Sequence, residues 1–407
     1  ISLFFIRFLI FVLIVISITA FLVNNNTAVQ DRLMTRVINN VIPETFLDIE
    51  DSLRAIICGS RSPIASPGRA QTCVLVEAGD DIYIIDTGDG SANNLNSYNI
   101  PWPNVKGIIF THLHSDHISD LADVHLLSWV NGREGKLKVY GPEGVNSVTD
   151  GFDLTYSNDY IFRNAHHGDN VAALKNAGYV TQIIDINDPI FINSNELKVT
   201  AFEVLHDPVE PALGFRFDYK GRSIVVSGDT IYSENLISAS MNADVLIHEA
   251  MSIPLLEALR SAALASGRTT MAKILIDVQD YHTPALEVAE VAIKANVDHL
   301  ILYHLLPAPR SNIMENIFYR GMDDVMTNWT SSVDGTRVTL PIDSEEIILD
   351  EEKERKKQQK IKLMEYEKIE NIKKLKLEKE IERKKKKKRN KEKKKNKKEK
   401  KKKKKKK

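Results

Sequence analysis

Residues 107–117 read GIIFTHLHSDH, an apolar run that stops at three histidines and one aspartate. The run has the length and residue types of a buried β-strand. The cluster from His112 to His117 offers imidazole nitrogens and a carboxylate, donors that suit Zn²⁺ or a similar divalent ion. A single tetrahedral ion could not readily take all four side chains from so short a segment. The spacing therefore indicates two neighbouring ions that share the cluster and need further ligands from elsewhere in the chain.

Other apolar runs also end on a histidine or an aspartate. The residues at their ends are Asp86, His206, Asp229, His248 and His304. Runs rich in Val and Ile belong inside a layered α/β structure, whose strand ends commonly meet at one polar site. A chance cluster of surface histidines would not explain six ends of the same kind. Helical stretches alternate with the strands, and the clearest is Pro284–Ala295, with Thr283 as its expected N-cap.

The formal net charge of zero is a cancellation between two parts of the chain. Residues 1–350 hold 23 basic and 44 acidic side chains, a balance of −21, and residues 351–407 hold 32 and 11, a balance of +21. Apolar residues at 43% and charged residues at 27% exclude a wholly disordered or collagen-like chain. About 300 residues lie between the two ends, enough for one large domain or two small ones.

The two ends are expected to carry no catalytic residue. Residues 1–23 are apolar apart from Arg7 and three hydroxyl side chains, which favours an uncleaved transmembrane helix over a cleaved signal peptide. Residues 24–50 are expected to form a linker helix, and residues 346–407 a charged helix followed by a disordered lysine run. The lysine run is either a polybasic arm for anionic lipid or nucleic acid, or a low-complexity extension without a role. We expect a membrane anchor with the domain at residues 51–345 in the periplasm or outside the cell.

Cys58 and Cys73 flank a loop rich in Ser, Pro and Gly. A disulfide closing this loop would stabilise an exported domain by roughly 3 kcal/mol. Two buried thiols in a reducing compartment are the alternative, and the sequence favours neither.

The stretch THLHSDH resembles the HxHxDH signature of the metallo-β-lactamase superfamily. The order of Asp86, this signature, His206, Asp229 and His304 also resembles the motif order of that superfamily over most of residues 52–310. Finer features are similar to the ribonuclease Z and arylsulfatase-like branch. They are Gly59-Ser60 with Pro63 and Arg69, Leu213–Arg216 after His206, Ser227–Thr230, His248–Ala250 and Tyr281–Thr283.

The resemblance implies an α/β fold, the αββα four-layer sandwich, with two Zn²⁺ ions or other divalent metals at its edge. It assigns His112, His114 and His206 to one ion. It assigns Asp116, His117 and His304 to the other, with Asp229 as the bridging ligand. Asp86 is expected to orient the signature loop without coordinating a metal.

Several polar residues are candidates for proton transfer or substrate contact. Asp116 could accept a proton from the attacking water as well as bind metal. His282 lies just before a predicted helix, where it could bind an anionic oxygen or protonate a leaving group. His248 with Glu249 is either a catalytic pair or a support for the loop. His166 and His167 are candidates for a substrate wall, whereas His125 and His299, inside apolar segments, are expected to be structural.

The leading hypothesis is a membrane-tethered or exported dinuclear hydrolase that cleaves a phosphodiester, sulfate ester or related ester with a metal-bound hydroxide. In ribonuclease Z a long arm that grips tRNA lies between the third motif and the Gly-Asp-Thr. Here only 22 residues separate His206 from Asp229, and they read as a plain hairpin. Because the catalytic region is also acidic and would repel a polyanion, a ribonuclease Z-type tRNA 3′ endonuclease is the second hypothesis. A non-catalytic surface or nucleic-acid-binding module that uses the lysine tail is the third.

Overall fold

A computed structural model describes residues 3–41 and 51–349 of the chain. The chain divides into a unit of Ile1–Ile49 with Asn96–Pro101 and a unit of Glu50–Leu95 with Trp102–Lys407. In the first unit, helix α1 (Leu3–Asn25) is followed by α2 (Thr27–Val41). A membrane span needs about 20 consecutive apolar residues. No helix meets this need among the residues that the structure describes, so the transmembrane helix predicted for residues 1–23 is not supported.

Parts of the predicted ends are not covered. Residues 42–50 of the predicted linker helix and the predicted lysine tail from residue 350 onward lie outside the described residues.

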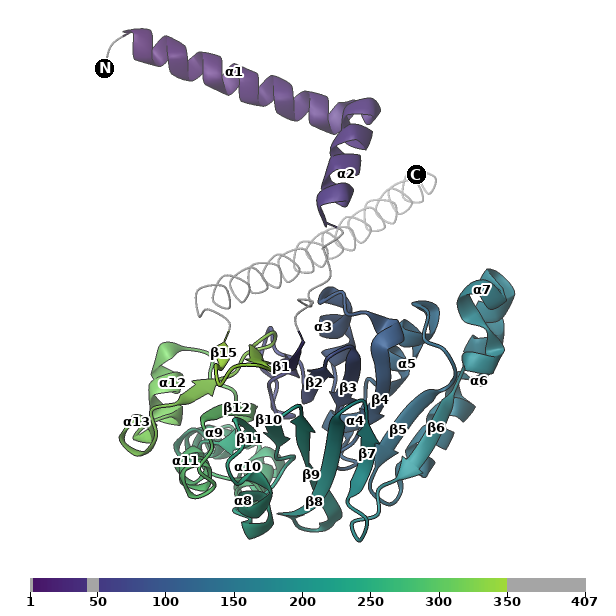
Figure 1. Ribbon diagram of the computed structural model, residues 1–407. Coiled ribbons are helices and arrows are strands. Elements are labelled where there is room, and N and C mark those ends of the chain that lie inside the picture. The colour runs from purple at the N-terminus through teal and green to yellow at the C-terminus, as the bar shows by residue number, and fades with distance from the viewer. Residues whose placement is uncertain (1–2, 42–50, 350–407) are drawn as a thin grey trace, which may run out of the picture. The chain divides into compact units, whose positions relative to one another are not determined.

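The second unit contains two β-sheets (Figure 1). The eight-stranded sheet has the order β15-β14-β1-β2-β3-β4-β5-β6 and the seven-stranded sheet the order β13-β12-β11-β10-β9-β8-β7. The strands of the first are β1 (Ser52–Gly59), β2 (Cys73–Ala78), β3 (Asp81–Ile85), β4 (Val105–Ile109), β5 (Leu137–Gly141), β6 (Tyr179–Ile183), β14 (Arg337–Pro341) and β15 (Ile348–Leu349). Those of the second are β7 (Ile190–Ser194), β8 (Leu197–His206), β9 (Val209–Tyr219), β10 (Arg222–Val226), β11 (Val245–Met251), β12 (His299–Leu306) and β13 (Trp329–Ser331).

Helices cover the outer faces of the two sheets. The α-helices of this unit are α3 (Ser91–Ser97), α4 (Ser115–Ile118), α5 (Leu121–Val130), α6 (Val145–His167), α7 (Asp169–Ala172), α8 (Glu234–Ser240), α9 (Ile253–Ala265), α10 (Thr269–Asp277), α11 (Ala285–Lys294), α12 (Asn312–Phe318) and α13 (Met322–Val325). Helix α6 packs on β5 and β6, whereas α8 packs on β8 and β9, and α11 on β11 and β12. The expected α/β fold with two sheets and helices is confirmed.

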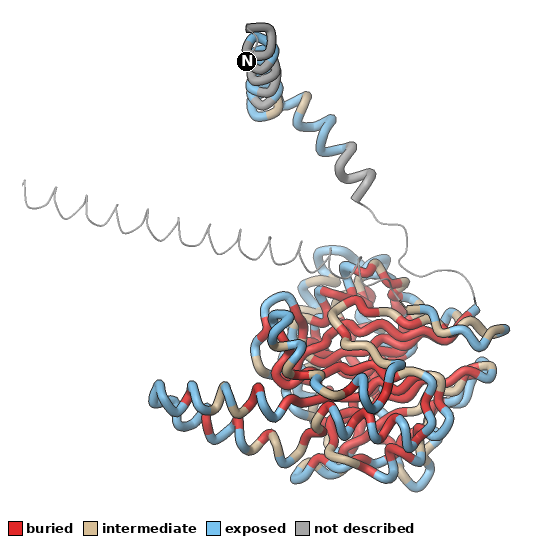
Figure 2. Tube along the Cα trace, turned by 90° about the vertical axis from the view of Figure 1, so that its left-hand side faces the viewer, coloured by how far each residue is buried: buried red, intermediate tan, exposed pale blue. Residues whose placement is uncertain are grey.

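The main core lies between the sheets. Val76 from β2 and Phe217 from β9 belong to the same buried apolar cluster, which alternating residues of both sheets build. A second cluster fills the space between β11 and α11, where Leu246 meets Val288 and Ala292. The strands are the buried part of the domain, and exposed residues concentrate on the helices and loops (Figure 2).

The strand directions bring the polar run ends together. Strands β3 to β6 are parallel to one another, and so are β10 to β13. The carboxyl ends of parallel strands meet at one edge of a sheet. The segment between His206 and Asp229 forms the β8–β9–β10 meander, which agrees with the predicted hairpin.

One predicted detail of the helices is wrong. Helix α11 begins at Ala285 with Pro284 as its cap residue, and no side chain caps its N-terminus. The Thr283 hydroxyl instead donates to the Thr230 carbonyl oxygen at 2.6 Å. This tertiary hydrogen bond outcompetes the local capping bond that the sequence suggested.

Candidate metal centre

The signature loop leaves β4 at Ile109 and enters the short helix α4 at Ser115. Asp86, which directly follows β3, binds this loop through hydrogen bonds. Its Oδ1 accepts from the Thr111 backbone N–H at 2.9 Å, and its Oδ2 accepts from the Thr111 hydroxyl at 2.8 Å. The same Oδ2 lies 2.8 Å from Nδ1 of His117, so that the other ring nitrogen points away from Asp86. Asp86 thus orients the loop, as expected of a residue behind the metal ligands.

The first predicted ligand set is brought together. His112, His114 and His206 form a group whose candidate ligand atoms all lie within 4.8 Å of one another. His112 Nε2 is 2.9 Å from His114 Nδ1, and His206 Nε2 is 3.4 Å from the same atom. His206 Nδ1 donates to the Tyr281 carbonyl oxygen at 2.9 Å, which leaves Nε2 free to bind a metal. His114 is the exposed member of the group, so it marks the side open to substrate.

The second predicted set is also assembled, with Asp229 between the two sets. Asp116, His117 and His304 form another group within the same limit. Asp229 Oδ2 lies 3.3 Å from Nε2 of both His117 and His304, and 4.0 Å from Nε2 of His112. One carboxylate oxygen therefore faces ligands of both sets, as a bridging position requires.

Two residues of the centre have left-handed backbone conformations that are rare for residues other than glycine. Asp86 has φ 58° and His304 has φ 43°. In the β11–β12 pairing, Glu249 faces Tyr303 and Ala250 faces Leu305, so His304 is the extra residue of a β-bulge. The bulge turns its ring toward Asp229, and bulges commonly re-aim side chains in this way next to functional sites.

The charges of the group fit divalent cations. Burial lowers the pKa of His112 well below the usual range and that of His206 to about 4, so both imidazoles stay neutral. Burial acts against ionisation of Asp229, but the imidazoles of His304 and His117 outweigh it and hold its pKa well below the usual range. Neutral imidazoles and ionised carboxylates are the metal-binding forms.

Unpaired buried atoms give a second indication. Nε2 of His117 and Oδ1 of Asp229 are buried and make no hydrogen bond. Burial lowers the pKa of His117, but the carboxylates of Asp229, Asp86 and Asp116 outweigh it and raise the pKa well above the usual value. The surroundings thus favour positive charge at this point, which a bound cation would supply.

Glu249 and His282 adjoin the two groups, and together with His304 they form a further group that could hold a metal ion. Glu249 is fully buried, and its Oε1 lies 3.1 Å from His282 Nδ1 and accepts from the Thr283 backbone N–H at 3.0 Å. Burial raises the pKa of Glu249 well above the usual value and lowers the pKa of His282. The contact is a hydrogen bond between the Glu249 carboxyl group and the His282 imidazole. His282 and His304 stack with ring centroids 5.3 Å apart, which places the pair next to the second ligand set.

The other candidate histidines lie apart from these groups. His248 Nδ1 lies 2.7 Å from the Glu249 carbonyl oxygen, and burial lowers the pKa of His248 to about 4. His166 and His167 are exposed in the last turn of α6. His125 Nε2 accepts from the Gly178 backbone N–H, and His299 Nε2 lies 2.9 Å from the Thr330 hydroxyl. None of these five belongs to a candidate metal group among the described residues.

The sequence interpretation chose His248 as a catalytic candidate, but the structure places the side chain of Glu249 beside the centre. Successive residues of a strand point to opposite faces, so only one member of the pair could face the site. The register of β11 against β12, which the sequence does not display, decides which one.

The metallo-β-lactamase superfamily domain model matches residues 66–265 of the chain. A ribonuclease Z of Mycolicibacterium gilvum (strain PYR-GCK) is 30% identical over 258 residues, which cover 63% of this chain and 85% of that relative. The chain belongs to the metallo-β-lactamase superfamily. It is therefore a metal-dependent hydrolase, and zinc is the typical metal of this superfamily.

Other superfamily members show the same likeness. A ribonuclease Z of Mycobacterium marinum (strain ATCC BAA-535 / M) is 29% identical over 255 residues, covering 62% of this chain and 86% of that relative. The metallo-β-lactamase fold protein YhfI from Bacillus subtilis superposes with a TM-score of 0.52 at 18% identity, covering 71% of this chain and all of that one. The short form of human tRNase Z superposes with a TM-score of 0.50 at 20% identity, covering 71% of this chain and all of that one. At these identities, the two solved structures support the fold alone.

Proposed function

We propose that this superfamily member is a dinuclear zinc phosphodiesterase that acts on a small or medium-sized ester. The observation that carries the proposal is the position of Asp229 Oδ2 between the two groups of ligands. His112, His114 and His206 would hold one ion, Asp116, His117 and His304 the other, and Asp229 would bridge them. When bound, two divalent ions make a water nucleophilic near neutral pH and neutralise charge that develops on the phosphoryl group.

The chain's own residues supply the remaining functions. Asp116 faces both His117 and His304, at 3.6 Å and 3.4 Å, so it can accept a proton as well as bind metal. His282, hydrogen-bonded to the buried Glu249, is placed to donate a proton to a leaving-group oxygen, with Glu249 as the group that orients it. His206 is fixed by its bond to Tyr281 O, which keeps Nε2 turned toward the site.

Two observations support a substrate smaller than tRNA. The segment between His206 and Asp229 is occupied by β9, β10 and their short turns, which leaves no insertion in this segment that could grip a large substrate. The acidic balance of −21 over residues 1–350 disfavours a polyanion.

The proposal is tested with the full chain loaded with zinc and given a bis-aryl phosphate, an aryl sulfate and a lactone. We expect the bis-aryl phosphate to be hydrolysed fastest, and we expect His114→Ala to abolish this hydrolysis. His299→Gln is the matched control. It removes an imidazole at the start of β12, the end of that strand opposite His304, and its hydrolysis rate should stay near that of wild type. Equal rates for His114→Ala and wild type would contradict the assignment of the site.

The tRNA 3′ endonuclease stays as a second candidate because relatives named ribonuclease Z match over 85% and 86% of their own length. Cleavage of a precursor tRNA by the zinc-loaded chain, at a rate above that for the bis-aryl phosphate, would favour it.

We also propose that the domain works in the periplasm or outside the cell. The structure contains a disulfide between Cys58 and Cys73, and such bonds persist mainly in oxidising compartments. If alkylation in intact cells labelled both cysteines without prior reduction, this proposal would be wrong.

A further inference from the structure

The loop that the disulfide closes forms backbone hydrogen bonds close to both left-handed residues of the metal centre. Cys58 is the last residue but one of β1 and Cys73 is the first residue of β2, so residues 60–72 leave the sheet between the two strands. On one side, the backbone N–H of Leu305, the residue after His304, donates to the Ser60 carbonyl oxygen at 3.0 Å. On the other side, the backbone N–H of Gly88, two residues after Asp86, donates to the Thr72 carbonyl oxygen at 2.9 Å. The loop thus pairs with the backbone within two residues of each left-handed residue.

The backbone segments around Gly59 and Gly88 are closely packed. A Cβ on Gly59 would lie 1.5 Å from Gln71 O, and one on Gly88 would lie 2.2 Å from Asp116 O. The two branches of the loop and the segment after Asp86 are therefore in direct backbone contact with each other and with the signature helix. A displacement of the loop would displace Asp116 or His304.

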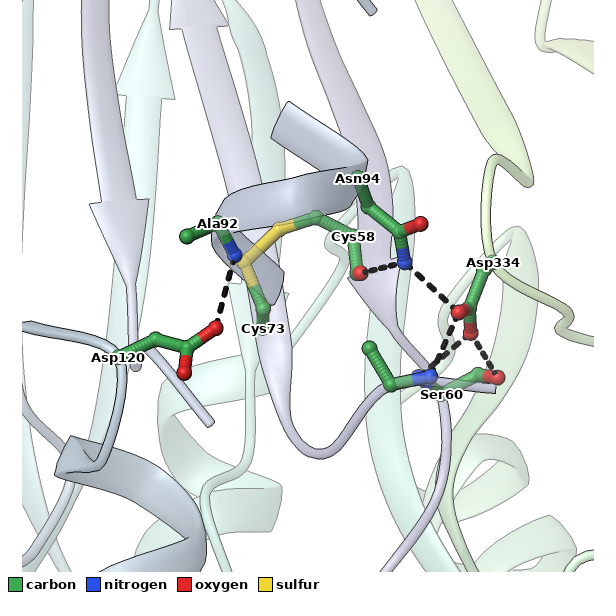
Figure 3. The surroundings of a disulfide bond; sticks show 8 residues. Cys58, Ser60, Cys73, Ala92, Asn94, Asp120 and Asp334 are labelled. Atoms are coloured by element: carbon green, nitrogen blue, oxygen red, sulfur yellow. Dashed lines mark hydrogen bonds between the residues drawn. A yellow bond between two sulfur atoms is a disulfide. The ribbon is translucent and has the colours of Figure 1, made fainter. Parts of the chain in front are cut away.

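Asp334 fastens both branches of this loop (Figure 3). Its Oδ1 accepts from the Ser60 N–H at 3.1 Å and from the Ser60 hydroxyl at 2.6 Å. Its Oδ2 accepts from the Ala70 N–H at 2.7 Å and from Asn94 Nδ2 at 2.8 Å. Asn94 Nδ2 also donates to the Cys58 carbonyl oxygen at 2.8 Å, which links this network to the disulfide.

We propose that Asp334 and the Cys58–Cys73 loop are positioning elements of the metal centre that hold Asp86 and His304 in their left-handed conformations. Left-handed conformations of such residues are unfavourable and persist only when the surroundings impose them. The bonds to Ser60 O and Thr72 O provide this restraint, and Asp334 keeps the two loop branches in register. Within the part of the chain that the structure describes, the Asp334 carboxylate is hydrogen-bonded to Ser60, Ala70 and Asn94 and to no candidate ligand, so it acts through the loop. The inference rests on the proposed zinc centre.

The test compares Asp334→Asn with Asp244→Asn in the full chain. Asp244 is the control. It lies just before β11, at the end of that strand away from the metal centre, and its Oδ2 likewise accepts from the backbone N–H and the hydroxyl of one residue, Ser223, while its Oδ1 pairs with Arg222. In Asp334→Asn one acceptor oxygen becomes an amide NH₂ group, which meets a backbone N–H donor in either orientation, so one branch of the loop loses its anchor. We expect zinc affinity, measured by competition with a chromophoric chelator, to fall about 10-fold relative to the control. We also expect amide exchange of Leu305 to accelerate in the metal-free protein, with no change in Asp244→Asn.

A second variant guards against misfolding of the first. Cys58→Ala with Cys73→Ala removes the loop closure and leaves Asp334 in place, and it should show the same two changes. The inference is overturned if either readout matches the Asp244→Asn control in both variants, because the loop would then stabilise the domain without positioning the site. If wild type itself binds no zinc, the proposed function is wrong, and Leu305 exchange alone decides whether the loop restrains the strand end.

Discussion

At the scale of single residues, the centre combines groups that the chain brings from far apart. Glu249 from β11 reaches His282, which precedes α11, and both are shielded from water. In such a place a carboxyl and an imidazole can share one proton without either becoming a costly buried charge.

Glu249→Gln should lower the turnover of the bis-aryl phosphate about 100-fold, since Gln cannot orient His282 as a proton donor in the same way. The zinc content should stay at the wild-type level, because the predicted ligand sets do not include Glu249. Steady-state rates together with metal analysis check this. Turnover within a factor of two of wild type would show that the Glu249–His282 pair does not take part in the reaction.

His125 gives a pH dependence of stability that is separate from the metal centre. Burial, with a smaller contribution from Arg133, lowers its pKa to about 3, and its Nε2 accepts from the Gly178 N–H. The unfolded chain, with a histidine pKa near 6.5, binds the proton more readily than the folded one. The stabilisation is therefore complete above about pH 6.5 and is lost as the pH falls, by about 2 kcal/mol at pH 5.

Urea unfolding of wild type and His125→Gln at pH 7 and pH 5 measures this effect. Wild type should lose about 2 kcal/mol more than the variant between the two pH values. Equal losses would mean that the buried imidazole can take up a proton in the folded state.

At the scale of elements, the turn that carries the ligand Asp229 at the end of β10 is tightly packed. Gly228, between β10 and Asp229, has φ 65°, and a Cβ there would lie 2.5 Å from Leu213 O. Gly221, in the β9–β10 turn, has φ 87°, but a Cβ there would meet no atom within 4 Å. The two glycines share the backbone strain and differ in the space around them.

Gly228→Ala should therefore destabilise the domain by about 2 kcal/mol more than Gly221→Ala, because it adds overpacking to the same backbone strain. Zinc affinity should fall in Gly228→Ala alone, since Asp229 follows directly. Urea unfolding and chelator competition on both variants check this. Similar results for both would indicate that the backbone around Leu213 can move aside.

At the scale of the whole molecule, the fold and the metal are expected to stabilise each other. Ions that bind only the folded state stabilise it by about 2.7 kcal/mol for each site at a free concentration 100 times the Kd. Chelation of zinc should therefore lower the midpoint of thermal unfolding, and His114→Ala should show a smaller difference between loaded and chelated forms. An unchanged midpoint in wild type would contradict a tightly bound centre.

The charge distribution leads to a prediction for the lysine-rich end. Removing residues 351–407 takes away a balance of +21 and leaves the acidic part of the chain. Turnover of a small neutral ester should not change, whereas any salt-dependent retention on RNA should disappear. A large loss of turnover would show that this segment packs on the catalytic domain.

The sequence by itself determined the α/β fold with two sheets, the family, and the residues that gather at the centre. These follow from local features, namely apolar runs of strand length, the residues that end them, and the spacing within THLHSDH. The tertiary structure decided which member of the His248–Glu249 pair faces the site, how Thr283 is bonded, and that Cys58 and Cys73 are joined. It also brought Asp334 to the disulfide loop across 274 positions of the chain. Strand register and long-range contacts set these features, and no pattern within a short stretch of sequence records them.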